Sequence, residues 1–301
     1  MAPAGYQLTT FLYGLGGGRT RPLAAPTELQ NRDAGNWTLG LQSGPVLIGG
    51  VCPAVQVDGT TCGSAAIALA MASDAGSRGI VGNQNGAEPD AAAVAADFAA
   101  LQREIKAQTN RKRWIFGWPQ AWGTAPWGAA RVMRFAGHEY YHRMVVDTSI
   151  PQATRVLTRA AECARAGYPV LLYTGGDTSR GWGTAVPRHV VVLHSPPADP
   201  AAPQISDDSG SDDLLGADRT GDAEIDAKLA ELANRLAATL KRAQGVDTGA
   251  PLYIYDPSRG HNTEVTLEDL ISRRVDPDAL GGWPHLTWAV LPKPLATKPQ
   301  E

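Results

Sequence analysis

Apolar residues recur every three or four positions in several stretches of this chain, which is the spacing of an amphipathic helix. The pattern predicts helices over residues 62–73, 90–108, 131–135, 149–166, 225–243 and 266–271. Short apolar runs rich in β-branched residues predict strands over residues 46–48, 140–146, 168–173, 189–194, 252–255 and 285–291. Helices precede most of the strands, and the pattern is that of an α+β fold.

Composition divides the chain into parts. Gly, Pro and polar residues dominate residues 1–44, which we expect to form a partly flexible N-terminal arm. The domain-like pattern covers residues 45–292, and residues 293–301 are a flexible tail. An insertion at about 196–250 begins with an acidic linker that has little to bury, so we expect this linker to be disordered. The helix that follows, 225–243, could bind a partner or dock on its own domain.

Charge and composition exclude several classes of function. A net charge of -3 gives no reason to expect a nucleic-acid partner. No apolar run approaches the roughly 20 residues of a membrane span. The N-terminus lacks the features of a secretory signal, so we expect a cytoplasmic protein or one exported by a signal-independent route. Three cysteines are too few for a disulfide framework, and the abundance of Arg and Ala is typical of GC-rich bacterial genomes.

The most informative segment surrounds Cys62. Thr60 and Thr61 can cap a helix there, and the thiol then lies at the positive end of the helix dipole, which favours the nucleophilic thiolate. Gln56 lies six residues upstream, where its amide could donate to an oxyanion near the sulfur. A small cysteine buried in a core helix would show the same local pattern.

Two later segments carry partners for this thiol. His189 begins an apolar strand, and Asp256 ends another strand just before a turn. Cys62, His189 and Asp256 supply the nucleophile, the general base and the carboxylate that a thiol protease needs. A strand histidine and a turn-initiating Asp-Pro are the structural alternatives for the last two residues.

Taken together, these segments resemble the papain-like cysteine peptidases, and most closely the double-glycine leader (bacteriocin-processing) peptidases and their relatives. The resemblance rests on Gln56, residues 62–65, residues 189–193, residues 255–257, Gly260 and residues 265–270. It implies N-terminal helices packed on an antiparallel sheet, with the insertion between the His and Asp strands. It also implies an oxyanion hole formed by Gln56 and the Cys62 backbone N–H, a protein, peptide or isopeptide substrate, and no cofactor or metal.

Other functions remain open at this point. Transglutaminases and deamidases use the same residue order, so acyl transfer to an amine is one alternative. The unusual N-terminal arm and the insertion suggest another, which is a secreted bacterial effector or a non-catalytic binding module.

The segment His138-Glu139-Tyr-Tyr-His142 matches the H-E-x-x-H motif of zinc metallopeptidases, which requires a helix. Gly137 and the run of Tyr and Val residues around this segment favour a strand instead, where the two histidines lie too far apart to chelate one ion. A zinc metallopeptidase is therefore a further alternative.

Tryptophans cluster in the loop before the predicted short helix. Trp118, Trp122 and Trp127 could line a substrate groove, because aromatic rings offer apolar contact with a polar edge. Packing of the loop onto the core would use the same residues.

Overall fold

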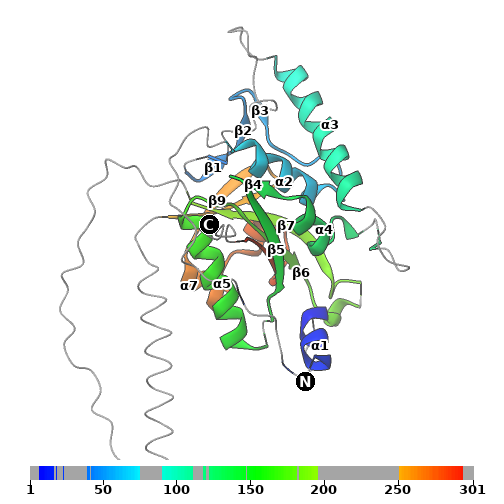
Figure 1. The fold of residues 1–301 in the computed structure, drawn as a ribbon, viewed down its shortest axis with the longest axis vertical. Coiled ribbons are helices and arrows are strands. Elements are labelled where there is room, and N and C mark those ends of the chain that lie inside the picture. Colours follow the sequence, from blue (N-terminus) through cyan, green and yellow to red (C-terminus); the bar gives the residue numbers. More distant parts are fainter. Residues whose placement is uncertain are drawn as a thin grey trace, which may run out of the picture. The chain divides into compact units, whose positions relative to one another are not determined.

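An eight-stranded antiparallel sheet lies at the centre of the fold in the computed structural model (Figure 1). Its strands in spatial order are β1 (Gly44–Pro45), β9 (His261–Val265), β8 (Leu252–Asp256), β7 (Pro187–His194), β6 (Val170–Gly175), β10 (His285–Pro292), β5 (His138–Met144) and β4 (Arg134–Phe135). A separate hairpin pairs β2 (Leu47–Ile48) with β3 (Cys52–Pro53). The mixed composition of helices and antiparallel strands confirms the predicted α+β class.

The structure describes residues 7–16, 18, 23, 39–40, 42–74, 90–110, 118–119, 122–146, 148–181, 183–195 and 251–293. These residues belong to one structural unit, and a second unit comprises Asp199–Gly249. The second unit lies outside the described residues, and with it the predicted acidic linker and the predicted helix 225–243. The predicted tail 293–301 is described only at Lys293.

The described part of the chain contains six α-helices. They are α1 (Leu8–Leu15), α2 (Cys62–Ala72), α3 (Ala91–Thr109), α4 (Pro126–Val132), α5 (Ile150–Arg165) and α7 (Leu267–Ser272), with short 3-10 turns η3 (Thr178–Arg180) and η4 (Pro277–Leu280). α2, α3 and α4 pack together, and α2 also packs on β7. α5 packs against α7 and against β6, β7 and β10. Every residue of β6 is buried, as expected for a strand covered on both faces.

One predicted helix is wrong in its position. Residues 131–135 were expected to form a short helix, but α4 ends at Val132, and Arg134–Phe135 form β4. β4 turns into β5 through Ala136 and Gly137, both of which have positive φ angles. A two-residue hairpin turn needs positive φ at both of its central residues, so that its twist matches that of the strands. Gly137 therefore serves the turn between β4 and β5.

Several elements have no counterpart among those predicted from the sequence. β9 pairs with β8 along its whole length, although its sequence His-Asn-Thr-Glu-Val is mostly polar. α1 lies within the arm, residues 1–44, and includes Gly14, a residue with low helix propensity. β1 begins at the last residue of this arm and pairs with β9. In each case contacts within the fold outweigh weak local preferences.

The insertion separates two strands that are direct neighbours in the sheet. β7 pairs with β8 in antiparallel register, with His194 opposite Tyr253. The ends to be joined after β7 and before β8 are therefore only about 5 Å apart, the spacing of paired strands.

Replacing Asp199–Gly249 by a short Gly/Ser linker should leave the domain folded. Loop-closure entropy changes only slowly with loop length, and a few residues suffice to connect neighbouring strands. We expect a thermal unfolding temperature within a few degrees of the wild-type value, measured by circular dichroism. Loss of the cooperative transition would show instead that the insertion contributes to the core.

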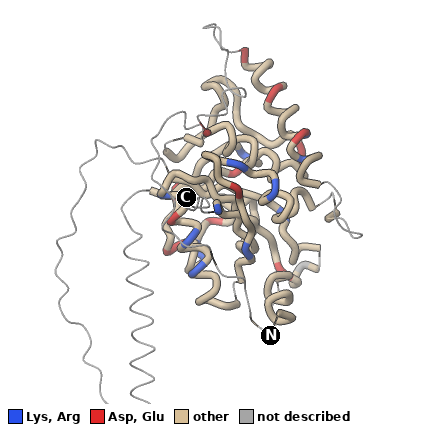
Figure 2. The backbone as a smooth tube through the Cα atoms, viewed as in Figure 1, with Lys and Arg blue, Asp and Glu red and all other residues tan. Residues whose placement is uncertain are grey.

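Acidic and basic residues are interspersed over the described elements (Figure 2). Within the described ranges, no helix is both long enough and apolar enough to cross a membrane.

Candidate active site

Cys62 is the first residue of α2, a helix in which every residue except Met71 is buried. The first helical hydrogen bond joins the N–H of Ala65 to the carbonyl oxygen of Thr61. The N–H groups before Ala65, including that of Cys62, therefore have no acceptor within the helix. These groups and the helix dipole place partial positive charge beside the thiol.

The loop before α2 is organised by Asp58 rather than by a side-chain cap. Thr61 is the N-cap residue, but its side chain makes no capping hydrogen bond, contrary to expectation. The Thr61 hydroxyl instead accepts from the N–H of Asp58 at 2.9 Å. The Asp58 carboxylate accepts from the backbone and hydroxyl of Thr60, and Lys106 of α3 approaches it to 3.7 Å. Hydrogen bonds from Thr60 lower the pKa of Asp58, so this loop carries a carboxylate at neutral pH.

His189 connects the other two predicted site residues. Its Nε2 donates to Oδ1 of Asp256 at 2.7 Å, which leaves Nδ1 for the Cys62 side chain, to which the ring is also hydrogen bonded. Burial alone would lower the pKa of His189, but the hydrogen bonds to Asp256 and Cys62 outweigh it and raise the pKa to about 9. The His189 ring can therefore take up a proton at neutral pH and retain it.

Asp256 is fixed by the turn that follows β8. Its Oδ1 accepts from the N–H of Ser258 at 2.8 Å, and its Oδ2 accepts from the Ser258 hydroxyl at 2.7 Å. Burial would raise the pKa of Asp256, but the hydrogen bonds from His189 and Ser258 outweigh it and lower the pKa. Asp256 thus both initiates a turn and orients the imidazole. Ser258 was not predicted, although Asp-Pro-Ser is a recognisable turn sequence.

Gln56 lies beside this turn. Its backbone N–H donates to the carbonyl oxygen of Pro257 at 2.8 Å. Its side-chain Nε2 donates to the carbonyl oxygen of Asp58 at 2.9 Å, which leaves the second N–H of the amide for another acceptor. Buried Gln102 of α3 holds the backbone on either side, accepting from Val57 N and donating to Val55 O. The position of Gln56 is thus tied both to the Asp256 turn and to α3.

The ring of His189 is covered by a glycine that sequence inspection did not single out. A Cβ atom at Gly281 would lie 2.1 Å from Cδ2 and 2.6 Å from Nε2 of His189, closer than any real contact. Gly281 follows η4 and has a φ of 69°. The turn is held in place by a hydrogen bond from the Thr174 hydroxyl to the Leu280 carbonyl oxygen. Glycine is thus needed at position 281 both for its conformation and for its lack of a side chain.

Cys62 itself is only 2% exposed. Part of its cover is the backbone of Gly123, where an added Cβ would lie 3.9 Å from the Cys62 sulfur. The position has a φ of 70°, which glycine adopts without strain. The loop that contains Gly123 therefore lies against the Cys62 sulfur.

The three predicted groove tryptophans form one cluster next to this loop. The ring centre of Trp118 lies 5.3 Å from that of Trp122 and 5.1 Å from that of Trp127, in edge-to-face geometry. Trp122 directly precedes Gly123, and Trp127 is 46% exposed. The cluster therefore presents an aromatic surface within a few residues of the segment that covers Cys62.

The H-E-x-x-H residues lie on strand β5, as the flanking residues indicated. His138 is buried, with its Nδ1 2.7 Å from the carbonyl oxygen of Lys293. Glu139 is exposed and forms ion pairs with Lys293 and Arg134. The ring of His142 packs against Trp127. His142 lies four positions along the strand from His138, which corresponds to about 13 Å. The described residues contain no cluster of three possible metal ligands.

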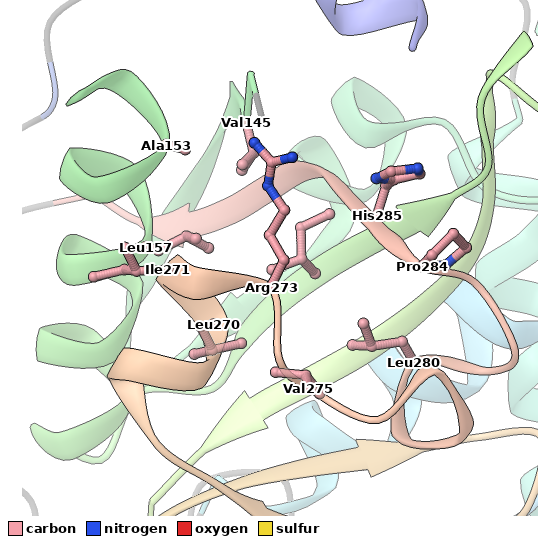
Figure 3. Close-up of a pocket in the computed structure, with 11 residues that line it drawn as sticks. Val145, Ala153, Leu157, Leu270, Ile271, Arg273, Val275, Leu280, Pro284 and His285 are labelled. Carbon is pink, nitrogen blue, oxygen red and sulfur yellow. The ribbon is translucent and has the colours of Figure 1, made fainter. Parts of the chain in front are cut away.

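An apolar pocket lies elsewhere, between α5, α7 and β10 (Figure 3). Leu157 and Leu280 are among its lining side chains, and Arg273 and His285 supply the polar ones. The pocket does not include the His189 site. Its lining residue Leu280 ends η4, the turn that is followed by Gly281.

Comparison with protein-family models, with curated proteins and with solved structures found no match to this chain.

Proposed function

We propose that this protein is a cysteine peptidase or related amide-bond hydrolase that uses Cys62, His189 and Asp256. The observation that carries the proposal is the bridging imidazole: one ring nitrogen binds a carboxylate, and the ring also hydrogen bonds a thiol at a helix start. A buried thiol–imidazole–carboxylate chain is the arrangement that activates a nucleophile. The thiol helix packed on a sheet whose neighbouring strands carry the other two residues also supports the resemblance to papain-like peptidases.

In the first half of the proposed reaction, the proton of Cys62 passes to His189, and the thiolate attacks the carbonyl carbon of the substrate. The carbon–oxygen double bond opens to an oxyanion, which the Cys62 N–H and the free N–H of Gln56 would bind. When the oxyanion collapses, the carbon–nitrogen bond breaks, and His189 gives its proton to the leaving amine. Asp256 holds the His189 ring in position throughout.

In the second half, water attacks the thioester carbonyl and His189 takes one of its protons. The carbon–sulfur bond then breaks, which releases the acid product and returns the sulfur to the thiolate–imidazolium pair. An amine in place of water would give acyl transfer through the same thioester.

The three cysteines allow a direct test of the proposal, because exposure and site chemistry predict different reactivities. Cys52 is 8% exposed, Cys62 2% and Cys163 is fully buried, so exposure alone predicts that Cys52 reacts first. Burial also raises the pKa of Cys163 to about 12, which keeps it a thiol. If His189 activates Cys62, iodoacetamide should label Cys62 roughly tenfold or more faster than Cys52 near pH 6.5, read by peptide mass spectrometry.

The matched variant for this test is His189→Ala, which should abolish the preference for Cys62 while leaving the labelling of Cys52 unchanged. Equal and slow labelling of all three cysteines in the wild type would argue against thiolate chemistry and in favour of a non-catalytic binding module.

A further inference from the structure

Two buried hydroxyl groups next to the start of α2 have no hydrogen-bond partner among the described residues. They belong to Thr124 and to Tyr173, which is 1% exposed. A buried hydroxyl without a partner loses its hydrogen bonds to water and gains none in return, so such groups are rare in folded proteins. Two such hydroxyl groups near the proposed nucleophile suggest that a hydrogen-bond acceptor for them forms only during the reaction.

Strand pairing places Tyr173 beside the nucleophile's helix. Tyr173 of β6 is directly opposite Val190 of β7, and directly opposed residues point to the same face of a sheet. The Val190 side chain reaches the first turn of α2, since its Cγ2 would lie 3.3 Å from a Cβ at Gly63. The hydroxyl of Thr124 lies at the same place, 2.8 Å from that Cβ position. The Tyr173 ring therefore projects towards the helix start that carries Cys62.

Electrostatics agree with this placement. The pKa of Tyr173 is raised well above its usual value, mainly by burial and also by negative charge on Cys62. The hydroxyl is therefore neutral and keeps the proton that it can donate. The charged group hydrogen bonded to Cys62 is His189, which is in turn hydrogen bonded to Asp256. Asp58 of the loop before α2 pairs with Lys106 of α3.

We propose that the Tyr173 hydroxyl donates a hydrogen bond to the sulfur of Cys62 when the thiol has lost its proton. A neutral thiol is a weak acceptor, whereas a thiolate is a strong one, so the bond forms when the proton moves to His189. This accounts for a buried donor that has no hydrogen-bond partner among the described residues and that projects towards the helix start whose thiol becomes negative. Tyr173 is then a fourth catalytic residue, and this role rests on the proposed function of Cys62.

The test compares Tyr173→Phe with Tyr168→Phe. Tyr168 is also buried, but it packs on Phe135 and His138. That is the region of β4, next to the C-terminal end of α2. The rate of Cys62 labelling by iodoacetamide is measured from pH 5 to pH 10 by peptide mass spectrometry. We expect Tyr173→Phe to move the Cys62 profile to higher pH, with a roughly tenfold lower rate near pH 6, and Tyr168→Phe to leave it unchanged.

Thermal unfolding separates this role from a structural one. Removing an unpartnered hydroxyl should leave the unfolding temperature of Tyr173→Phe unchanged or raise it, because no hydrogen bond is lost. A wild-type labelling profile in Tyr173→Phe, with Cys62 still labelled fastest, would overturn the role of Tyr173 alone. Slow labelling of Cys62 in the wild-type protein would overturn the proposed function, and this inference with it.

Discussion

Cys62→Ala should abolish cleavage of every peptide that the wild-type protein cleaves. Alanine removes the atom that attacks the carbonyl, and no other thiol can replace it, since Cys52 and Cys163 lie on other elements, β3 and α5. The expected loss in rate is at least about 10⁴-fold, the size seen when a nucleophile is removed from a catalytic triad. The measurement is a peptide-library digest of both proteins, with the products identified by mass spectrometry.

Two further variants make the digest decisive. Cys52→Ser should cleave the library like the wild type, although Cys52 is more exposed than Cys62. Glu139→Gln should also be active, because Glu139 forms surface ion pairs on β5 and does not contribute to the thiol site. Full cleavage by Cys62→Ala together with none by Glu139→Gln would reject the thiol mechanism and restore the zinc hypothesis.

The three residues of the proposed triad could be singled out from the sequence because each occupies a position with a local signature. A cysteine at the start of a small-residue helix, a histidine at the start of an apolar strand and an aspartate before a turn can each be recognised without knowledge of the fold. That the three meet depends on β7 and β8 being neighbours, which the structure confirms despite the long insertion between them.

Other parts of the site depend on contacts between distant segments and leave no local pattern. The need for glycine at position 281 arises from the His189 ring, which lies far away in sequence and meets it only in the folded chain. The placement of Tyr173 depends on its register with Val190 across two strands. β9 was missed for a similar reason, since its polar sequence forms a strand only because β8 offers it a partner.

Gly281→Ala should disable the site without removing any of its functional groups. The new Cβ would lie 2.1 Å from Cδ2 of His189, so the imidazole must move or the turn after η4 must shift. Movement of the imidazole breaks its 2.7 Å hydrogen bond to Asp256, and a shift of the turn removes the backbone that covers the ring. We expect the rate of peptide cleavage to fall by about 10²- to 10⁴-fold, the range attributed to general acid–base catalysis. The preferential labelling of Cys62 should be lost as well.

Gly282→Ala is the matched control for this clash. Gly282 has a φ of 83°, so alanine is strained there as it is at Gly281, but no atom lies within 4 Å of its added Cβ. Both variants should therefore lose about 1 kcal/mol of unfolding free energy from the backbone alone. Only Gly281→Ala should also lose activity, because only its methyl group meets the imidazole. Equal activities in the two variants, measured on folded protein, would show that the position of His189 does not limit the reaction, and the triad assignment would then fail.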